Sequence, residues 1–158
     1  MHRLASITMI DAEISKYEEK VFRALAQLFR HVYAATYPFR PEQFLRLERF
    51  EAILRKHTLP NFDVWLAKMN SEPIGFVAIG QNFIDQLYIS PAHQGSGLGS
   101  FWIEQAKTIY PDFLELYTLA SNKRAIAFYE KHGFAITERG IAPDEKVPDV
   151  KMRWRSKT

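Results

Sequence analysis

Residues 88–102, YISPAHQGSGLGSFW, decide how this chain folds. An apolar run ends at Ser90, and a helical stripe begins near Gly97 and continues through Trp102. Between them stand small residues, which let backbone N–H groups turn inward, next to the partial positive charge of a helix N-terminus. We therefore expect a strand, a loop that can hold a pyrophosphate without a lysine, and a helix. On the glycines alone, a simple tight turn is an equally good interpretation.

Two familiar nucleotide motifs do not fit this loop. A Walker loop ends in Gly-Lys-Ser/Thr, and the dinucleotide fingerprint needs a final glycine where Ser100 stands. The loop therefore predicts a phosphate ligand of another kind.

The flanking segments predict a mixed sheet. Residues 63–90 form three short apolar runs joined by the turn signals MNSEP and GQN, which is typical of an antiparallel meander. Downstream, 113–120 is strand-like, 122–133 is helical with Gly133 as its C-cap, and 134–155 reads as two strands around a proline-containing loop. A strand, a helix and a further strand imply one parallel pair.

Two amphipathic helices are expected before the meander. Apolar stripes run from Val21 to Val32 and from Phe44 to Leu54, with Pro38 and Pro41 between them and Pro41 placed early in the second helix. Together the segments predict an α+β, sandwich-like fold with a mixed, mostly antiparallel central sheet and about four flanking helices.

Composition narrows the class of protein. The 158 residues match one compact domain over 1–158, and no repeat or linker divides them. Lys and Arg outnumber Asp and Glu by 21 to 18, which does not imply nucleic acid, although a small DNA-binding protein built on the paired N-terminal helices is a remote alternative. The chain has no cysteine, so disulfides, thiolate zinc sites and cysteine nucleophiles are excluded.

Location and metal content follow from similar observations. Acidic residues come early and no run of ~18 apolar residues occurs, so we expect a soluble, cytoplasmic protein without a membrane partner. Four of the five histidines show no mutual spacing that suggests a metal site: His2, His31, His93 and His132.

A second motif, SNKRAIAFYEKHGF at 121–134, identifies the family. The chain resembles the GNAT superfamily of acyl-CoA-dependent N-acetyltransferases, whose Gln/Arg-x-x-Gly-x-Gly/Ala pattern is matched by Gln94, Gly97 and Gly99. The later family pattern is matched by Asn122, Ala125, Phe128, Tyr129, Gly133 and Phe134. The resemblance is close over residues 63–155, and the N-terminal helices match in position and type. Its first strand is expected in ASITMID, residues 5–11.

The resemblance implies that acetyl-CoA is the acyl-donor substrate and an amine is the acceptor, with a monomer or homodimer as the assembly. It implies that the backbone of β-strand residues Leu87, Tyr88 and Ile89 pairs with the pantetheine arm. Asn122 would bind the pantetheine or a water, and Tyr129 would point its hydroxyl at the sulfur. The pyrophosphate would meet the amides of the loop: Gln94, Gly95, Ser96, Gly97, Leu98, Gly99 and Ser100. Arg124 and Lys131 are candidates for the outer phosphate, although exposed helical cations are more often only solvated.

The implied reaction moves an acetyl group directly to a primary amine, and a non-catalytic acyl-CoA-binding or regulatory module is the alternative. Tyr129 is the candidate general acid, because an unperturbed tyrosine pKa of ~10 lies near that of a leaving thiol. The alternative is that Tyr129 is an aromatic core residue on an amphipathic helix.

Asp85 is the candidate base, on a face shared with Phe83, Leu87 and Ile89 if the strand alternates regularly. An ordinary paired carboxylate, a water relayed to Glu145 or Asp149, or no base at all are the alternatives. His57 and Tyr37 are candidates for the acceptor pocket.

Overall fold

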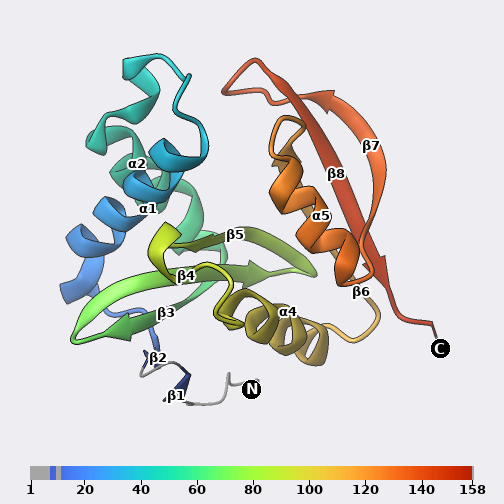
Figure 1. Cartoon of the computed structure of the whole chain (residues 1–158), viewed down its shortest axis with the longest axis horizontal. Helices are drawn as coiled ribbons and strands as arrows, with labels where there is room; N and C mark the ends of the chain where they lie inside the picture. Colours follow the sequence, from blue (N-terminus) through green and yellow to red (C-terminus); the bar gives the residue numbers. More distant parts are fainter. Residues whose placement is uncertain (1–7, 10–11, 158) are drawn as a thin grey trace.

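The computed structural model describes residues 8–9 and 12–157 (Figure 1). Its strands form one sheet in the order β1-β2-β3-β4-β5-β6-β8-β7. The strands are β1 (Thr8–Met9), β2 (Ala12–Lys16), β3 (Asp63–Met69), β4 (Glu72–Gly80), β5 (Phe83–Ile89), β6 (Phe113–Leu119), β7 (Ala135–Ile141) and β8 (Pro148–Arg155). The α-helices are α1 (Phe22–Thr36), α2 (Leu47–Ile53), α3 (Leu59–Asn61), α4 (Leu98–Ile109) and α5 (Lys123–Lys131). Short turns of other helix types are η1 (Glu19–Val21), η2 (Glu42–Leu45), the π-helical η3 (Leu54–Thr58) and η4 (Pro91–His93).

The predicted meander is confirmed. Strands β3, β4 and β5 pair antiparallel in sequence order. Each connecting turn has two residues with positive φ, Asn70 and Ser71 in the first and Gln81 and Asn82 in the second. Such turns match the natural twist of a hairpin.

The parallel pair is also confirmed, and it is very short. Strand β5 meets β6 only through Phe83 and Glu115, after which the two strands diverge (Figure 1). Beyond this pair, the described β5 residues have no strand neighbour on the β6 side. The divergence opens the sheet in its middle, between the meander and the antiparallel group β6-β8-β7.

Two helical layers cover the sheet. Helices α1 and α2 pack on one face around Phe29, Phe50 and Phe76, whereas α4 and α5 pack on the other around Trp102 and Ile126. In Figure 1 the first pair lies to the upper left, with α4 below and α5 against β8. With these four main helices, the predicted α+β class is confirmed.

One detail of the expected elements is wrong, and one strand was not expected. Pro41 was expected early in a helix that contains Phe44 to Leu54, but it precedes the separate turn η2. Arg46 has an extended backbone, so α2 begins only at Leu47. The expected first strand at residues 5–11 contains β1, and a further strand that the sequence analysis did not predict, Ala12–Lys16, lies between β1 and β3. Of those seven residues only Thr8–Met9 are described, as β1, and the others lie outside the described residues.

Candidate active site

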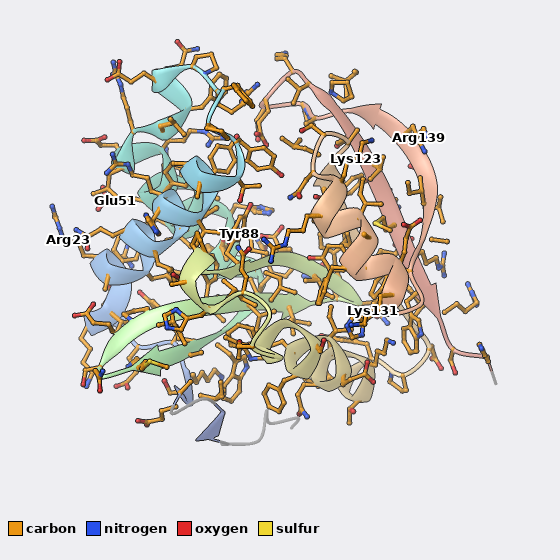
Figure 2. The ribbon with its side chains drawn as sticks, in the orientation of Figure 1. Arg23, Glu51, Tyr88, Lys123, Lys131 and Arg139 are labelled. Atoms are coloured by element: carbon orange, nitrogen blue, oxygen red, sulfur yellow. The ribbon has the colours of Figure 1, made fainter. Side chains whose placement is uncertain are left out.

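A cavity of about 710 Å³ lies where β5 and β6 diverge. Its walls come from α1, η3, β5, the end of β6, the start of α5 and the β7–β8 hairpin. Figure 2 shows Tyr88 near the middle of the molecule, between α1 and α5. The cavity collects many of the residues that the sequence singled out: Tyr37, His57, Asp85, Leu87, Tyr88, Asn122, Tyr129, Glu145 and Asp149. Ile89 and the glycine loop are not part of its wall.

The glycine loop has the backbone of an anion site. Gly95 and Gly97 adopt φ values of 81° and 92°, which favour glycine, and Gly97 is the N-cap of α4. In the part of the chain that the structure describes, no backbone N–H of residues 95–100 donates a hydrogen bond to another group. Among the residues that the structure describes, a Cβ added at Gly95 would meet nothing within 4 Å, and the buried hydroxyl of Ser96 has no hydrogen-bond partner. Free amides, open space and a helix N-terminus together suit a phosphate group.

Other members of the loop have structural roles. A Cβ at Gly99 would come within 3.0 Å of Phe128 Cζ, so this glycine lets α4 approach α5. Ser100 Oγ lies 3.0 Å from His132 Nε2, and Gln94 Nε2 donates to the carbonyl of Ile89 at 3.0 Å. Gln94 and Ser100 use their side chains for internal contacts and Gly99 has no side chain, so any phosphate contact of these three residues would come from their backbone.

Asn122 joins α5 to α1. Its Oδ1 accepts the backbone N–H of Ala125 at 3.1 Å and caps α5, while its Nδ2 donates to the hydroxyl of Tyr37 at 3.0 Å. The helix-cap role is therefore real. One N–H of the amide remains available to a ligand in the cavity.

Tyr129 is buried, with its ring packed edge-on against Phe128 and Phe134. Its hydroxyl has no hydrogen-bond partner among the described residues, and it keeps some accessible surface. Burial raises the pKa of Tyr129 above its ordinary value of 10, and the nearby Tyr37 adds to the effect. The phenol is thus protonated at neutral pH, as an acid must be, but its pKa is further from that of a thiol than the unperturbed value suggests.

Asp85 lies in a β-bulge. Ala78 pairs with Gln86 and Ile79 pairs with Ile84, so Asp85 is the extra residue of β5. A bulge re-aims a side chain. The expected face is therefore wrong for Leu87 and Ile89, which pack on the α4 side. Asp85 contacts His57 of η3 on the other face, where Phe83 also contacts Phe62.

Asp85 and His57 contact each other in the wall of the cavity. His57 Nε2 lies 2.9 Å from Asp85 Oδ1, and the other oxygen, Oδ2, is buried without a hydrogen-bond partner among the described residues. The side chain of Asp85 is only 11% exposed. Burial raises the pKa of Asp85, while the hydrogen bond and charge of His57 lower it. A buried carboxyl group with one free oxygen is suited to proton transfer.

Two cavity residues were missed by the sequence analysis. Tyr33 donates to Glu145 across the cavity, and burial raises its pKa to about 12. Arg49 lies over the Tyr33 ring at 5.3 Å. Phe29, Tyr33 and Tyr37 recur every four residues, so an aromatic stripe on one face of α1 was available as a signal.

The candidate cations for an outer phosphate are exposed. Arg124 and Lys131 have no ion-pair partner among the described residues, which agrees with the solvated interpretation. Figure 2 places Lys131 at the end of α5 nearest α4. No phosphate contact follows from this position alone.

Membrane-spanning and metal-binding features are absent from the described residues. Among the described helices, none has the length and apolar composition needed to cross a membrane. Within residues 8–9 and 12–157, no three histidine, aspartate or glutamate side chains gather as a metal site would require.

Comparisons with known proteins agree with this geometry. The profile of the acetyltransferase (GNAT) family matches residues 22–134. Peptidyl-lysine N-acetyltransferase YjaB of Salmonella typhimurium is 31% identical over 137 residues, which cover 86% of this chain and 90% of that protein. The solution structure of apo YjaB from Escherichia coli has a TM-score of 0.75 at 24% identity and covers 92% of this chain and 98% of that one.

A second solved structure has the same fold. PaiA N-acetyltransferase of Thermoplasma acidophilum, determined in complex with coenzyme A, has a TM-score of 0.70 at 21% identity, covering 91% of this chain and 98% of that one. The family match spans more than half of the chain, and the relatives are named as N-acetyltransferases. The chain therefore belongs to the GNAT acetyltransferase family and is an acyltransferase.

Proposed function

We propose that this enzyme transfers the acetyl group of acetyl-CoA directly to the side-chain amine of a peptidyl lysine. The observation that carries the proposal is the cavity at the divergence of β5 and β6, which holds both a candidate acid, Tyr129, and a candidate base, Asp85. A non-catalytic acyl-CoA-binding module would need neither group there.

The donor side rests on the loop and the open sheet edge. Free amides of residues 95–100 suit the pyrophosphate of a CoA thioester, and the unpaired edge of β5 offers backbone groups of Leu87 and Ile89 to its amide-bearing arm. Ser90 donates its N–H to the carbonyl of Ile74, so Tyr88, two residues earlier on β5, bonds to β4 and does not face the open edge. The carbonyl of Ile89 already accepts from Gln94, so its N–H is the group left for such pairing. Acetyl-CoA supplies an activated acetyl group, and the residues of the chain orient it.

The acceptor side rests on the charges that line the cavity as a whole. Carboxylates outnumber Arg and Lys side chains there, which favours a cationic acceptor such as an ammonium group. The carboxylates are Asp85, Glu138, Asp144, Glu145 and Asp149, and the cations are Arg49, Arg139 and Lys151. Ile141 and Tyr117, 61% and 52% exposed, line the same cavity and offer apolar surface to a polypeptide. The name of the YjaB relative supports the choice of lysine.

In the proposed reaction, Asp85 removes a proton from the lysine ammonium and Tyr129 gives a proton to the departing thiolate. The chain has no cysteine, so no thiol-linked acyl-enzyme intervenes.

The test is a thiol-release screen over amines of different classes with acetyl-CoA. A lysine peptide, its Nα-amine counterpart with the lysine blocked, free lysine and a polyamine form the panel, and mass spectrometry locates the product. Release with the lysine peptide and acetylation at its Nζ support the proposal. Release only with the other amines refutes the choice of acceptor, and no release with any of them refutes the donor or the activity.

The assembly and location belong to the same proposal. We propose a single domain over residues 1–158 that works in the cytoplasm as a monomer or homodimer, with no nucleic-acid or membrane partner. Light scattering on the purified protein decides its oligomeric state.

A further inference from the structure

His57 reaches the cavity from an irregular stretch of helix. It belongs to the π-helical turn η3, and single turns of this type occur frequently at functional sites. Asn61 Nδ2 donates to the backbone carbonyl of His57 at 2.8 Å, and the His57 ring lies 5.6 Å from that of Phe62. The backbone of His57 is thereby tied to α3, while its side chain remains 58% exposed on the cavity side.

Two neighbouring polar contacts connect η3 to the bulge of β5. His57 meets Asp85, and the next residue, Thr58, donates its hydroxyl to Gln86 Oε1 at 3.3 Å. Thr58 is fully buried and Gln86 is 8% exposed, so this second contact anchors η3 away from solvent. The anchored contact beside it holds the position of His57 relative to Asp85.

We propose that His57 is a positioning residue of the acyl transfer, which holds Asp85 by one oxygen and leaves the other oxygen to take the proton of the acceptor amine. This inference rests on the proposed function. An ionised carboxylate can only accept hydrogen bonds, so Nε2 of His57 is the donor to Oδ1 when Asp85 acts as a base. Oδ2, which is buried and has no hydrogen-bond partner among the described residues, is then the oxygen left to take the proton.

The proton balance of the step is complete. The acceptor nitrogen gives one proton to Asp85 Oδ2, and the neutral amine forms a C–N bond with the acetyl carbon as the C–S bond breaks. The nitrogen loses a second proton to solvent on becoming an amide, and the phenolate that Tyr129 leaves after giving its proton to sulfur takes a proton back from solvent. Asp85 returns its proton to solvent, so one proton is released overall.

The charge around Asp85 makes His57 the partner that matters. Burial favours the neutral carboxyl, and among the described residues only His57 opposes that effect. The other ionisable groups that line the cavity around Asp85 come from α1, α2, β5, β6, α5 and the β7–β8 hairpin. They are Tyr33, Tyr37, Arg49, Tyr88, Tyr117, Tyr129, Glu138, Arg139, Asp144, Glu145, Asp149 and Lys151. None of them contributes to the raised pKa of Asp85. Loss of the His57 donor therefore moves the titration of Asp85 to higher pH.

The experiment compares His57→Phe, which keeps a ring against Phe62 but has no donor, with His57→Gln, whose amide N–H replaces Nε2–H. The control is His31→Phe, the same change at an exposed position of α1 outside the cavity. The first measurement is the pH titration of the Asp85 carboxyl carbon by ¹³C NMR, assigned against Asp85→Asn. The second is the pH profile of kcat/KM for acetyl transfer.

In His57→Phe we expect the titration midpoint of Asp85 to rise and the acidic limb of the kcat/KM profile to move with it. On that limb, kcat/KM should fall about tenfold each time the midpoint rises by about one pH unit. His57→Gln and His31→Phe should stay near the parental protein. An unchanged Asp85 midpoint in His57→Phe, or a Gln variant that matches the Phe variant, overturns the proposal. The NMR titration needs no turnover, so an absence of acetyl transfer by the parental enzyme refutes the proposed function separately.

Discussion

The hydroxyl of Tyr129 can be removed with little effect on the fold. Replacing Tyr129 by Phe keeps the ring and its edge-on contacts with Phe128 and Phe134. Because the hydroxyl has no hydrogen-bond partner among the described residues, the free energy of unfolding loses none of the ~1 kcal/mol that a typical hydrogen bond contributes. We expect the change in unfolding free energy to be smaller than about 0.5 kcal/mol.

The effect on turnover should be much larger. A positioned general acid contributes about a hundredfold or more, which corresponds to roughly 2.7 kcal/mol of activation free energy. Acetyl-CoA affinity should stay close to parental, because the phenol is asked to act only when the thiolate leaves. A loss of turnover without loss of stability or affinity is specific to this role.

The assay is single-turnover acetyl transfer to the amine found by the screen, between about pH 7 and about pH 10. Since burial raises the pKa of Tyr129, the parental phenol should remain protonated over this range. Tyr110→Phe is the matched control, because the Tyr110 hydroxyl accepts the backbone N–H of Gln81 at 3.1 Å outside the cavity. This control should lose some stability and no turnover. An unaltered transfer rate in Tyr129→Phe would remove this residue from the mechanism and leave water as the acid.

Three further changes test the loop, the cap of α5 and the base. Gly95→Asn should weaken acetyl-CoA binding in calorimetry with little change in melting temperature, because Asn tolerates positive φ and its side chain enters the open space beside the free amides; equal affinity contradicts the phosphate site. Asn122→Ala should lower the free energy of unfolding by ~1 kcal/mol, because the helix cap is lost, and should raise the KM for acetyl-CoA. Asn122→Asp should keep the cap and raise only the KM; denaturant curves and steady-state kinetics measure the two effects. For Asp85, burial raises the pKa in the folded protein, so its contribution to stability is present at low pH and is lost as the pH rises through that pKa. Asp85→Asn cannot ionise and should abolish transfer. At about pH 7 it should unfold at a higher denaturant concentration than the parental protein, and the difference between the two midpoints should close towards about pH 4. Coincident unfolding curves at about pH 7 would count against a desolvated carboxylate.

Local pattern was enough for the elements of the fold. The period of apolar residues predicts α1, α4 and α5, and the turn residues between apolar runs predict the hairpins of β3, β4 and β5. The strand, glycine loop and helix at 83–109 require a chain that turns sharply after β5, and the next strand must then run parallel to it. These are properties of neighbouring residues, so they can be read without a tertiary structure.

Strand β2 and the start of α2 could not be predicted in this way. Ala12–Lys16 is too short and too polar at alternate positions to stand out, and its pairing with β3 spans some fifty residues of chain. The extended residue Arg46, which delays α2, carries no local signal of its own.

The residues of the site likewise fall into those that local spacing predicted and those that only the tertiary structure brought together. Spacing within one segment placed Asn122 and Tyr129 on α5 and the small residues of the loop before α4, because a helix and a tight turn repeat at known intervals. The face of Asp85 was decided by a one-residue bulge in the pairing of β4 with β5, and a shift of one residue reverses the direction of a strand side chain. Its contact with His57 joins residues 28 positions apart that only the packing of η3 on β5 brings together. Spacing in the sequence thus determined the residue types available for catalysis, whereas register and packing between distant segments decided which of them face one cavity.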